Sequence, residues 1–287
     1  MADYLIGDIL LKMDYGKMPV KYGKNLNLFR YDGIWNGDIV HFQIKFEDLD
    51  LDSQKRIGRN DPIYEIYRYD KEDSLVYHWG NLYHGFAIWP ERFSTSFSPA
   101  MLNQPELRED WFFSVISFHH QLLQRGACVL HASYVNYNGK ALLFTGPSNV
   151  GKSTQADLWN QYAECEIING DRALIRERGN GLYVYGYPCC GTSGICKNAT
   201  LPLDTIVILE QAERNQLVEL PMIDKIRMLT SAIELYPWDL KEIDQAFMVA
   251  ENIAKNVRVI KLCCLPDKGA FEILKQYLEE NNYGSSL

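Results

Sequence analysis

The residues best suited to chemistry form one run near the middle of the chain. This run is Gly146, Pro147, Ser148, Asn149, Val150, Gly151, Lys152 and Ser153, and it matches the Walker A pattern G-x-x-x-x-G-K-[ST]. Glycines let the backbone wrap so that successive N–H groups point at phosphate oxygens. Lys152 can reach the β- and γ-phosphates, and the Ser153 hydroxyl can ligate Mg²⁺. The run, with Thr154 directly after it, predicts a nucleotide site; a glycine turn that binds nothing is the alternative.

The predicted elements around this run suit a phosphate site. Residues 129–135 and 140–145 form two apolar strands, joined at Asn138-Gly139, a strong hairpin signal. A helix is expected near residues 153–161, and its positive N-terminal end would face the same anion.

Asp171 is the nearest acidic residue that follows a predicted strand, residues 166–169. Only a helix and a turn separate it from Lys152, so its strand is expected beside the strand 140–145. A carboxylate there could hold Mg²⁺ together with the Ser153 hydroxyl. The alternative is an ordinary turn aspartate after Asn169-Gly170.

A wider pattern links these residues. The stretch 129–135, with His131, then 141–153 and 168–171, resembles the HPr kinase/phosphorylase-like family over roughly residues 128–210. The P-loop domain of that family is related in structure to phosphoenolpyruvate carboxykinase. The resemblance implies a kinase dependent on ATP and Mg²⁺ that transfers the γ-phosphate to a hydroxyl. It implies that His131, Lys152 and Asp171 are catalytic, with Asp171 or His131 orienting or deprotonating the acceptor.

The chain departs from the pattern of that family at two positions. Gly170-Asp171 stands where those kinases usually carry two aspartates, and Thr154 where they carry a glutamate. No basic loop like the one they use on HPr is evident, so the expected acceptor is a hydroxyl, preferably of serine, in a peptide, another protein or a small molecule. The single acid leaves open a nucleotide-binding regulatory or scaffold protein with little transferase activity. The short interval from Lys152 to Asp171 disfavours a generic P-loop NTPase.

A second loop, residues 186–195, is rich in glycine and hydroxyl groups and is followed by Lys197. It either holds the acceptor or the transferring phosphoryl group, or forms a plain surface turn. Arg172 likewise either stabilises developing phosphate charge or joins a surface ion pair. The seven cysteines lack zinc-ligand spacing and are expected to be buried free thiols.

Composition limits the class of protein. The 287 residues carry a formal charge of −8, which argues against partners such as nucleic acid or anionic membranes. No apolar stretch approaches 18 residues, and the N-terminus lacks a signal-peptide pattern, so a cytoplasmic location is expected. Assembly into a homo-oligomer is left open.

The expected fold is α/β. Residues 106–287 are predicted to form a P-loop kinase domain of the HPr kinase and phosphoenolpyruvate carboxykinase type, with a mixed sheet. This domain is expected to open with one helix over residues 106–126. Residues 1–105 hold 18 of the 36 aromatic residues and predict a β-rich N-terminal region. Whether this region extends the same sheet is left open.

Overall fold

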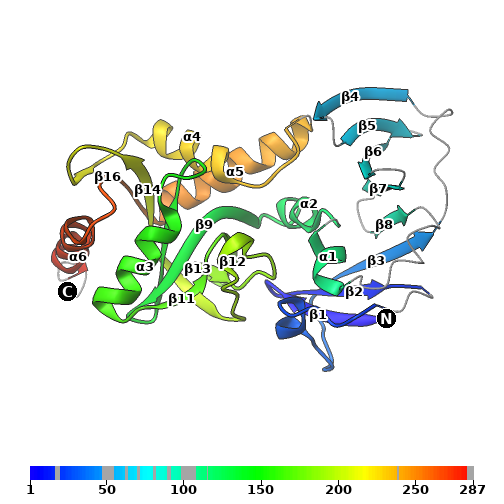
Figure 1. Ribbon diagram of the computed structural model, residues 1–287, viewed down its shortest axis with the longest axis horizontal. Coiled ribbons are helices and arrows are strands. Elements are labelled where there is room, and N and C mark those ends of the chain that lie inside the picture. The colour runs from blue at the N-terminus through cyan, green and yellow to red at the C-terminus, as the bar shows by residue number, and fades with distance from the viewer. Residues whose placement is uncertain are drawn as a thin grey trace. The chain divides into compact units, whose positions relative to one another are not determined.

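The computed structural model describes most of the chain (Figure 1). The described residues are 1–16, 20–46, 55–61, 64–69, 72–79, 82–88, 92–97, 108–114, 116–237 and 239–282. Contacts divide the chain into two compact units, Met1–Phe118 and His119–Leu287. The division therefore comes later in the chain than the expected boundary between residues 105 and 106.

The N-terminal unit is built on one eight-stranded sheet in the order β1-β2-β3-β8-β7-β6-β5-β4. The strands are β1 (Ala2–Ile6), β2 (Ile9–Asp14), β3 (Asp38–Phe46), β4 (Lys55–Asp61), β5 (Tyr64–Tyr69), β6 (Glu72–Trp79), β7 (Leu82–Ile88) and β8 (Arg92–Phe97). β3 runs parallel to β2 and β8, and the other neighbours pair antiparallel. This unit is β-rich, as the aromatic strand patterns predicted.

The single helix expected over residues 106–126 is divided into two. α1 spans Glu109–Ser114 and α2 spans Phe118–Leu123. Ser117 between them has φ +51°, a left-handed conformation that an α-helix cannot contain. Gly126, with φ +69°, follows α2 as the glycine pattern predicted.

Acidic side chains attach α1 to the N-terminal unit, which is why that unit extends beyond residue 105. Glu109 accepts hydrogen bonds from the Arg30 guanidinium (2.5 Å) and the Gly23 N–H (3.1 Å). Asp110 accepts one from the Leu26 N–H (2.7 Å), at the start of the 3-10 helix Leu26–Phe29.

The C-terminal unit is α/β with a mixed sheet, as expected. Its strands are β9 (Cys128–Tyr137), β10 (Lys140–Thr145), β11 (Glu166–Asn169), β12 (Arg172–Arg178), β13 (Gly181–Tyr185), β14 (Thr200–Gln211), β15 (Gln216–Val218) and β16 (Arg258–Cys264). Its other helices are α3 (Lys152–Ala163), α4 (Met222–Ala232), α5 (Leu240–Asn256), α6 (Lys268–Asn282) and the 3-10 turn Gly191–Ser193. Asn138 and Gly139 both have positive φ, which confirms the predicted β9–β10 hairpin.

Two long strands organise this sheet. β9 pairs antiparallel with β10, β11 and β12, and β14 pairs parallel with β10 and β16 and antiparallel with β13. β12 and β13 pair with each other, so β9, β12, β13, β14 and β10 form a closed circuit. β10 is thereby held by neighbours on both edges.

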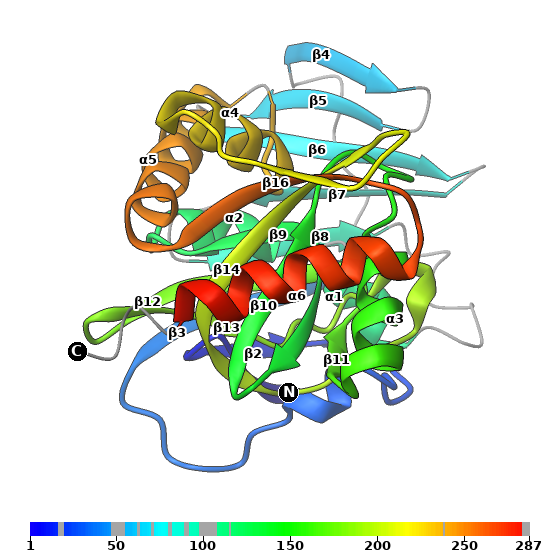
Figure 2. The same cartoon turned by 90° about the vertical axis from the view of Figure 1, so that its left-hand side faces the viewer.

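Helices cover both faces of these strands. Successive residues of β10 alternate: Ala141 and Leu143 face a core with α4 and α5, and Leu142 and Phe144 face a core with α3 and α6. Figures 1 and 2 show α4 and α5 on one side of the strands and α3 and α6 on the other. None of the described helices combines the length and apolar character needed to cross a bilayer.

Candidate functional site

The glycine-rich loop, residues 146–151, joins the end of β10 to the start of α3. Gly146 has φ +145°, and a Cβ there would lie 3.0 Å from the Leu209 carbonyl oxygen. Gly151 has φ +110° and precedes α3 without any side-chain cap. Because the first N–H groups of a helix have no intrahelical partner, this uncapped end favours an anion.

Lys152 directs its ammonium back into the loop. Its Nζ donates to the carbonyl oxygens of Gly146 (3.2 Å) and Pro147 (3.1 Å), and the residue is only 8% exposed. Burial lowers the pKa of Lys152; the Asp171 carboxylate opposes this shift and Arg172 adds to it. The ammonium group therefore lies against the backbone of the loop.

The first turn of α3 is attached to β9 and to the segment before Asp171. The Ser133 hydroxyl of β9 donates to the Lys152 carbonyl oxygen (2.6 Å). The Ser153 hydroxyl donates to the Gly170 carbonyl oxygen (3.5 Å). Ser153 therefore lies beside the residue that precedes Asp171.

The strand that leads to Asp171 has a different neighbour from the one predicted. β11 pairs with β9, so β9 lies between it and β10. β9 is long enough to pair with β10 along one edge and with both β11 and β12 along the other edge. Proximity in the sequence alone could not reveal this arrangement. The Ala132 N–H also donates to the Asp171 carbonyl oxygen (3.0 Å), which fixes Asp171 against β9.

Asn169, which the sequence analysis treated only as a turn residue, shapes the backbone around Asp171. Its fully buried side chain accepts hydrogen bonds from the N–H groups of Asp171 and Arg172 (both 2.9 Å). Its amide donates to the carbonyl oxygens of Tyr187 (2.8 Å) and Cys189 (3.1 Å). One side chain thus joins the acidic turn to the second loop.

Both oxygens of the Asp171 carboxylate have partners. His131 Nε2 lies 2.9 Å from Oδ1, and Arg172 Nη1 donates to Oδ2 (2.6 Å). The hydrogen bond with His131 lowers the pKa of Asp171, against the effect of burial, and the charges of Arg172, His131 and Lys152 lower it further. The carboxylate is therefore held in its ionised form.

The other predicted residues of the run lie around this centre. Pro147, Ser148 and Asn149 are exposed in the loop, and Thr154 is exposed on the first turn of α3. Val150 packs against the core beneath α3. Gln211, which the sequence analysis did not select, donates to the Asn149 carbonyl oxygen (3.1 Å) at the end of β14.

The second loop, residues 186–195, borders Asp171. A Cβ on Gly191 would lie 2.8 Å from Asp171 Cγ, and a Cβ on Gly170 would lie 2.2 Å from Ser193 Oγ. Ser193 therefore occupies the space that a side chain at position 170 would need. The HPr kinases that this chain resembles usually carry an aspartate there. The exposed segment 191–194 lies next to the Asp171 carboxylate.

Comparisons with known proteins add one structural likeness. No protein-family model matches the chain, and no curated protein matches its sequence. One solved structure that matches is the HPr(Ser) kinase/phosphatase from Coxiella burnetii, at 16% sequence identity and a TM-score of 0.34. The match covers 55% of this chain and 95% of that chain. At this level of likeness, the assignment of a function depends on the geometry of this chain's own residues.

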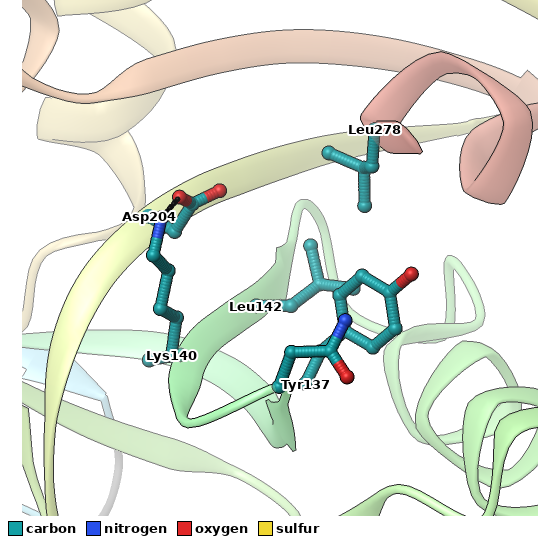
Figure 3. A pocket seen from close by; sticks show the side chains of 7 residues that line it. Tyr137, Lys140, Leu142, Asp204 and Leu278 are labelled. Atoms are coloured by element: carbon teal, nitrogen blue, oxygen red, sulfur yellow. Dashed lines mark hydrogen bonds and ion pairs between the residues drawn. The ribbon is translucent and has the colours of Figure 1, made fainter. Parts of the chain in front are cut away.

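A pocket lies away from the glycine-rich loop, around the β9–β10 turn (Figure 3). It is lined by Tyr137, Asn138, Lys140, Ala141, Leu142, Asp204 and Leu278. The Lys140 ammonium and the Asp204 carboxylate form an ion pair there (2.8 Å). Since β10 rises about 3.3 Å per residue, its start is roughly 17 Å from its end at Thr145. This pocket is therefore separate from the loop and Asp171.

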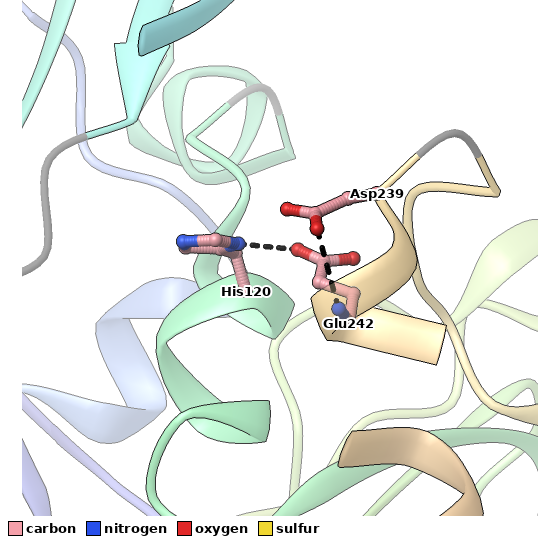
Figure 4. Close-up of side chains that lie close together, drawn as sticks. All are labelled: His120, Asp239 and Glu242. Carbon is pink, nitrogen blue, oxygen red and sulfur yellow. Dashed lines mark hydrogen bonds and ion pairs between the residues drawn. The ribbon is translucent and has the colours of Figure 1, made fainter. Parts of the chain in front are cut away.

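His120, Asp239 and Glu242 form a compact group between α2 and the start of α5 (Figure 4). Glu242 binds His120 Nδ1 and accepts a hydrogen bond from the Tyr236 N–H (2.5 Å). Asp239 caps α5 by accepting from the Lys241 N–H (2.9 Å). These hydrogen bonds join α2 to the start of α5, so they give the group a structural role. The seven cysteines are free thiols, as predicted, but only Cys128, Cys165, Cys190 and Cys264 are buried, and the other three are half-buried.

Proposed function

We propose that this chain is an ATP- and Mg²⁺-dependent kinase that transfers the γ-phosphate to a hydroxyl. The observation that carries the proposal is that Asp171 follows Gly170, whose carbonyl oxygen accepts a hydrogen bond from Ser153 in the first turn of the uncapped helix α3. An anion site and a carboxylate beside it are two of the parts that phosphoryl transfer uses.

Each residue has a stated role in this proposal. The backbone N–H groups between Gly146 and Thr154, where Pro147 has none, and the Lys152 ammonium bind the phosphates. Ser153 and Asp171 offer the oxygen ligands that Mg²⁺ prefers, and they approach each other through Gly170. Bound Mg²⁺ would neutralise charge on the phosphates.

The transfer itself needs a base for the acceptor. The acceptor oxygen forms a bond to the γ-phosphorus as the bond to the β-phosphate oxygen breaks, and ADP leaves. The acceptor proton passes to Asp171 or to His131, which are joined at 2.9 Å. The acceptor class is the hydroxyl of a peptide, another protein or a small molecule, with serine preferred.

A nucleotide-binding regulatory protein with little transferase activity is the second candidate. The packing of Ser193 against Gly170 favours it, because this packing leaves no room at position 170 for a second carboxylate. Binding of nucleotide without product formation would distinguish this candidate from the kinase.

The test is label transfer from γ-labelled ATP in the presence of Mg²⁺, with peptide, protein and small hydroxyl acceptors. Lys152→Ala should reduce transfer at least 100-fold and weaken nucleotide binding measured by calorimetry, because it removes the cation of the loop. Lys255→Ala, which removes an exposed cation on α5, is the matched control and should behave as wild type. Equal transfer by wild type and Lys152→Ala would refute the kinase assignment.

A further inference from the structure

Arg172 lies between two carboxylates of the C-terminal unit. Its Nη1 donates to Asp171 Oδ2 (2.6 Å) and to the Asp171 carbonyl oxygen (3.3 Å). Its Nε lies 3.3 Å from Oε2 of Glu234, a residue 62 positions further along the chain. The two contacts use different edges of the guanidinium, so they fix both its place and its orientation.

This arrangement leaves Arg172 poorly suited to bind a phosphate directly. One positive charge already faces two negative ones, which reduces the net attraction that Arg172 offers to a phosphate. Of the two roles that the sequence left open for Arg172, an ion pair fits this geometry better. The pair lies at the candidate site, and its effect therefore reaches Asp171.

Glu234 is itself firmly placed. Its N–H donates to the Val129 carbonyl oxygen (2.9 Å), and the preceding residue, Ile233, forms a β-bridge with Leu130. Ile233 is 5% exposed and belongs to the core beneath α4 and α5. Glu234 is thus attached to β9, the strand that also carries His131.

Contacts that start from β9 reach both oxygens of the Asp171 carboxylate. His131 of β9 binds Oδ1, and Glu234, also attached to β9, holds the arginine that binds Oδ2. A carboxylate that is hydrogen-bonded at both oxygens has little freedom to rotate. Its remaining lone pairs then point in a fixed direction, which is the requirement for a metal ligand or a base.

We infer that Glu234 is a positioning residue, which holds Arg172 against Asp171 and so fixes the orientation of that carboxylate. The kinetic consequence rests on the proposed kinase function, whereas the structural consequence does not. Misorientation of such a group typically costs one to two orders of magnitude in rate.

The structural test uses arginine side-chain ¹⁵N NMR on the full chain. The Arg172 signals, assigned by their loss in Arg172→Lys, should show slow Nη exchange in wild type because Nη1 is bound to Asp171. Glu234→Ala should abolish this protection, and Glu234→Gln, which keeps an acceptor of equal length, should retain most of it. Protection that persists in Glu234→Ala would overturn the inference. Glu251→Ala, which breaks an exposed pair on α5, is the control and should leave the signals unchanged.

The kinetic test separates the inference from the proposed function. Glu234→Ala should lower kcat about tenfold and leave KM for the nucleotide unchanged, since the loop does not use Glu234. In an Arg172→Met background the same substitution should have no further effect. Additive losses would overturn the inference. A wild-type protein that transfers no phosphate would refute the kinase, and the NMR result would still decide the role of Glu234.

Discussion

At the scale of single residues, the candidate site depends on side chains that fold the backbone around Asp171. Asn169 is the central one, because its side-chain amide forms hydrogen bonds with two backbone N–H groups and two carbonyl oxygens around Asp171. Ser193 is another, because its side chain fills the space beside Gly170. Neither residue carries a charge, but both help to fix the position of Asp171, which does.

The contact between Gly170 and Ser193 gives a prediction about one added methyl group. Gly170→Ala should lower the free energy of unfolding by about 1–3 kcal/mol, because the new Cβ would meet Ser193 Oγ and Cβ at 2.2 and 2.4 Å. Adding Ser193→Gly removes both atoms and should restore most of the loss. Urea denaturation followed by circular dichroism measures each value.

The matched control for this prediction is Gly181→Ala. A Cβ there would meet only Tyr183, at an ordinary 3.7 Å. Its cost should therefore stay below that of Gly170→Ala. A Gly170→Ala protein as stable as wild type would show that the second loop moves away freely.

At the scale of elements, the strands and the helix around the glycine-rich run could be predicted from periodicity. The hairpin, α3 and the strand Glu166–Asn169 all lie where the pattern placed them. The errors came where a non-local contact or a single residue decided the outcome. Ser117 divides one expected helix into two, and β9 separates the strand of Asp171 from β10.

The seating of α3 on its core gives a second prediction. Trp159 is fully buried and its ring contacts Tyr137, Phe144 and Phe271. Trp159→Ala should lower the free energy of unfolding by about 3–5 kcal/mol, since it leaves a large cavity under the helix that carries Lys152. Denaturant unfolding provides the measurement.

Trp159→Phe is the companion variant. It keeps an aromatic ring and removes the indole N–H, which is buried without a hydrogen-bond partner in the structure. Its cost should be clearly smaller than that of Trp159→Ala. Equal costs for the two variants would mean that ring packing does not hold α3.

At the scale of the whole molecule, a buried histidine links stability to pH. Burial lowers the pKa of His119 below its ordinary value of 6.5, although Glu234 and Glu242 act in the opposite direction. The unfolded chain therefore takes up this proton before the folded one does. The stability that neutral His119 contributes is fully present above about pH 6.5, the pKa of an ordinary histidine. It is lost as the pH falls through that value toward the lower pKa of His119 in the folded protein.

The corresponding prediction compares wild type with His119→Phe. Between pH 7.5 and 5.5, wild type should lose more unfolding free energy than the variant, by at most about 1.4 kcal/mol, because the variant has no proton to bind there. Urea midpoints at the two pH values provide the comparison. An identical pH dependence in both proteins would show that His119 is not held neutral by burial.

The sequence by itself determined the glycine-rich run, the strand and helix on either side of it, and the α/β class of the C-terminal unit. These depend on local steric preference and short-range hydrophobic periodicity, which neighbouring residues carry among themselves. The sequence pattern and the resemblance also grouped His131, Lys152, Ser153 and Asp171 in one site. The contacts among these residues, and the parts played by Asn169, Ser193 and Glu234, came only from the tertiary structure. Those contacts join residues far apart in the chain, because strand order and edge pairing are set by how all the strands and helices share one core.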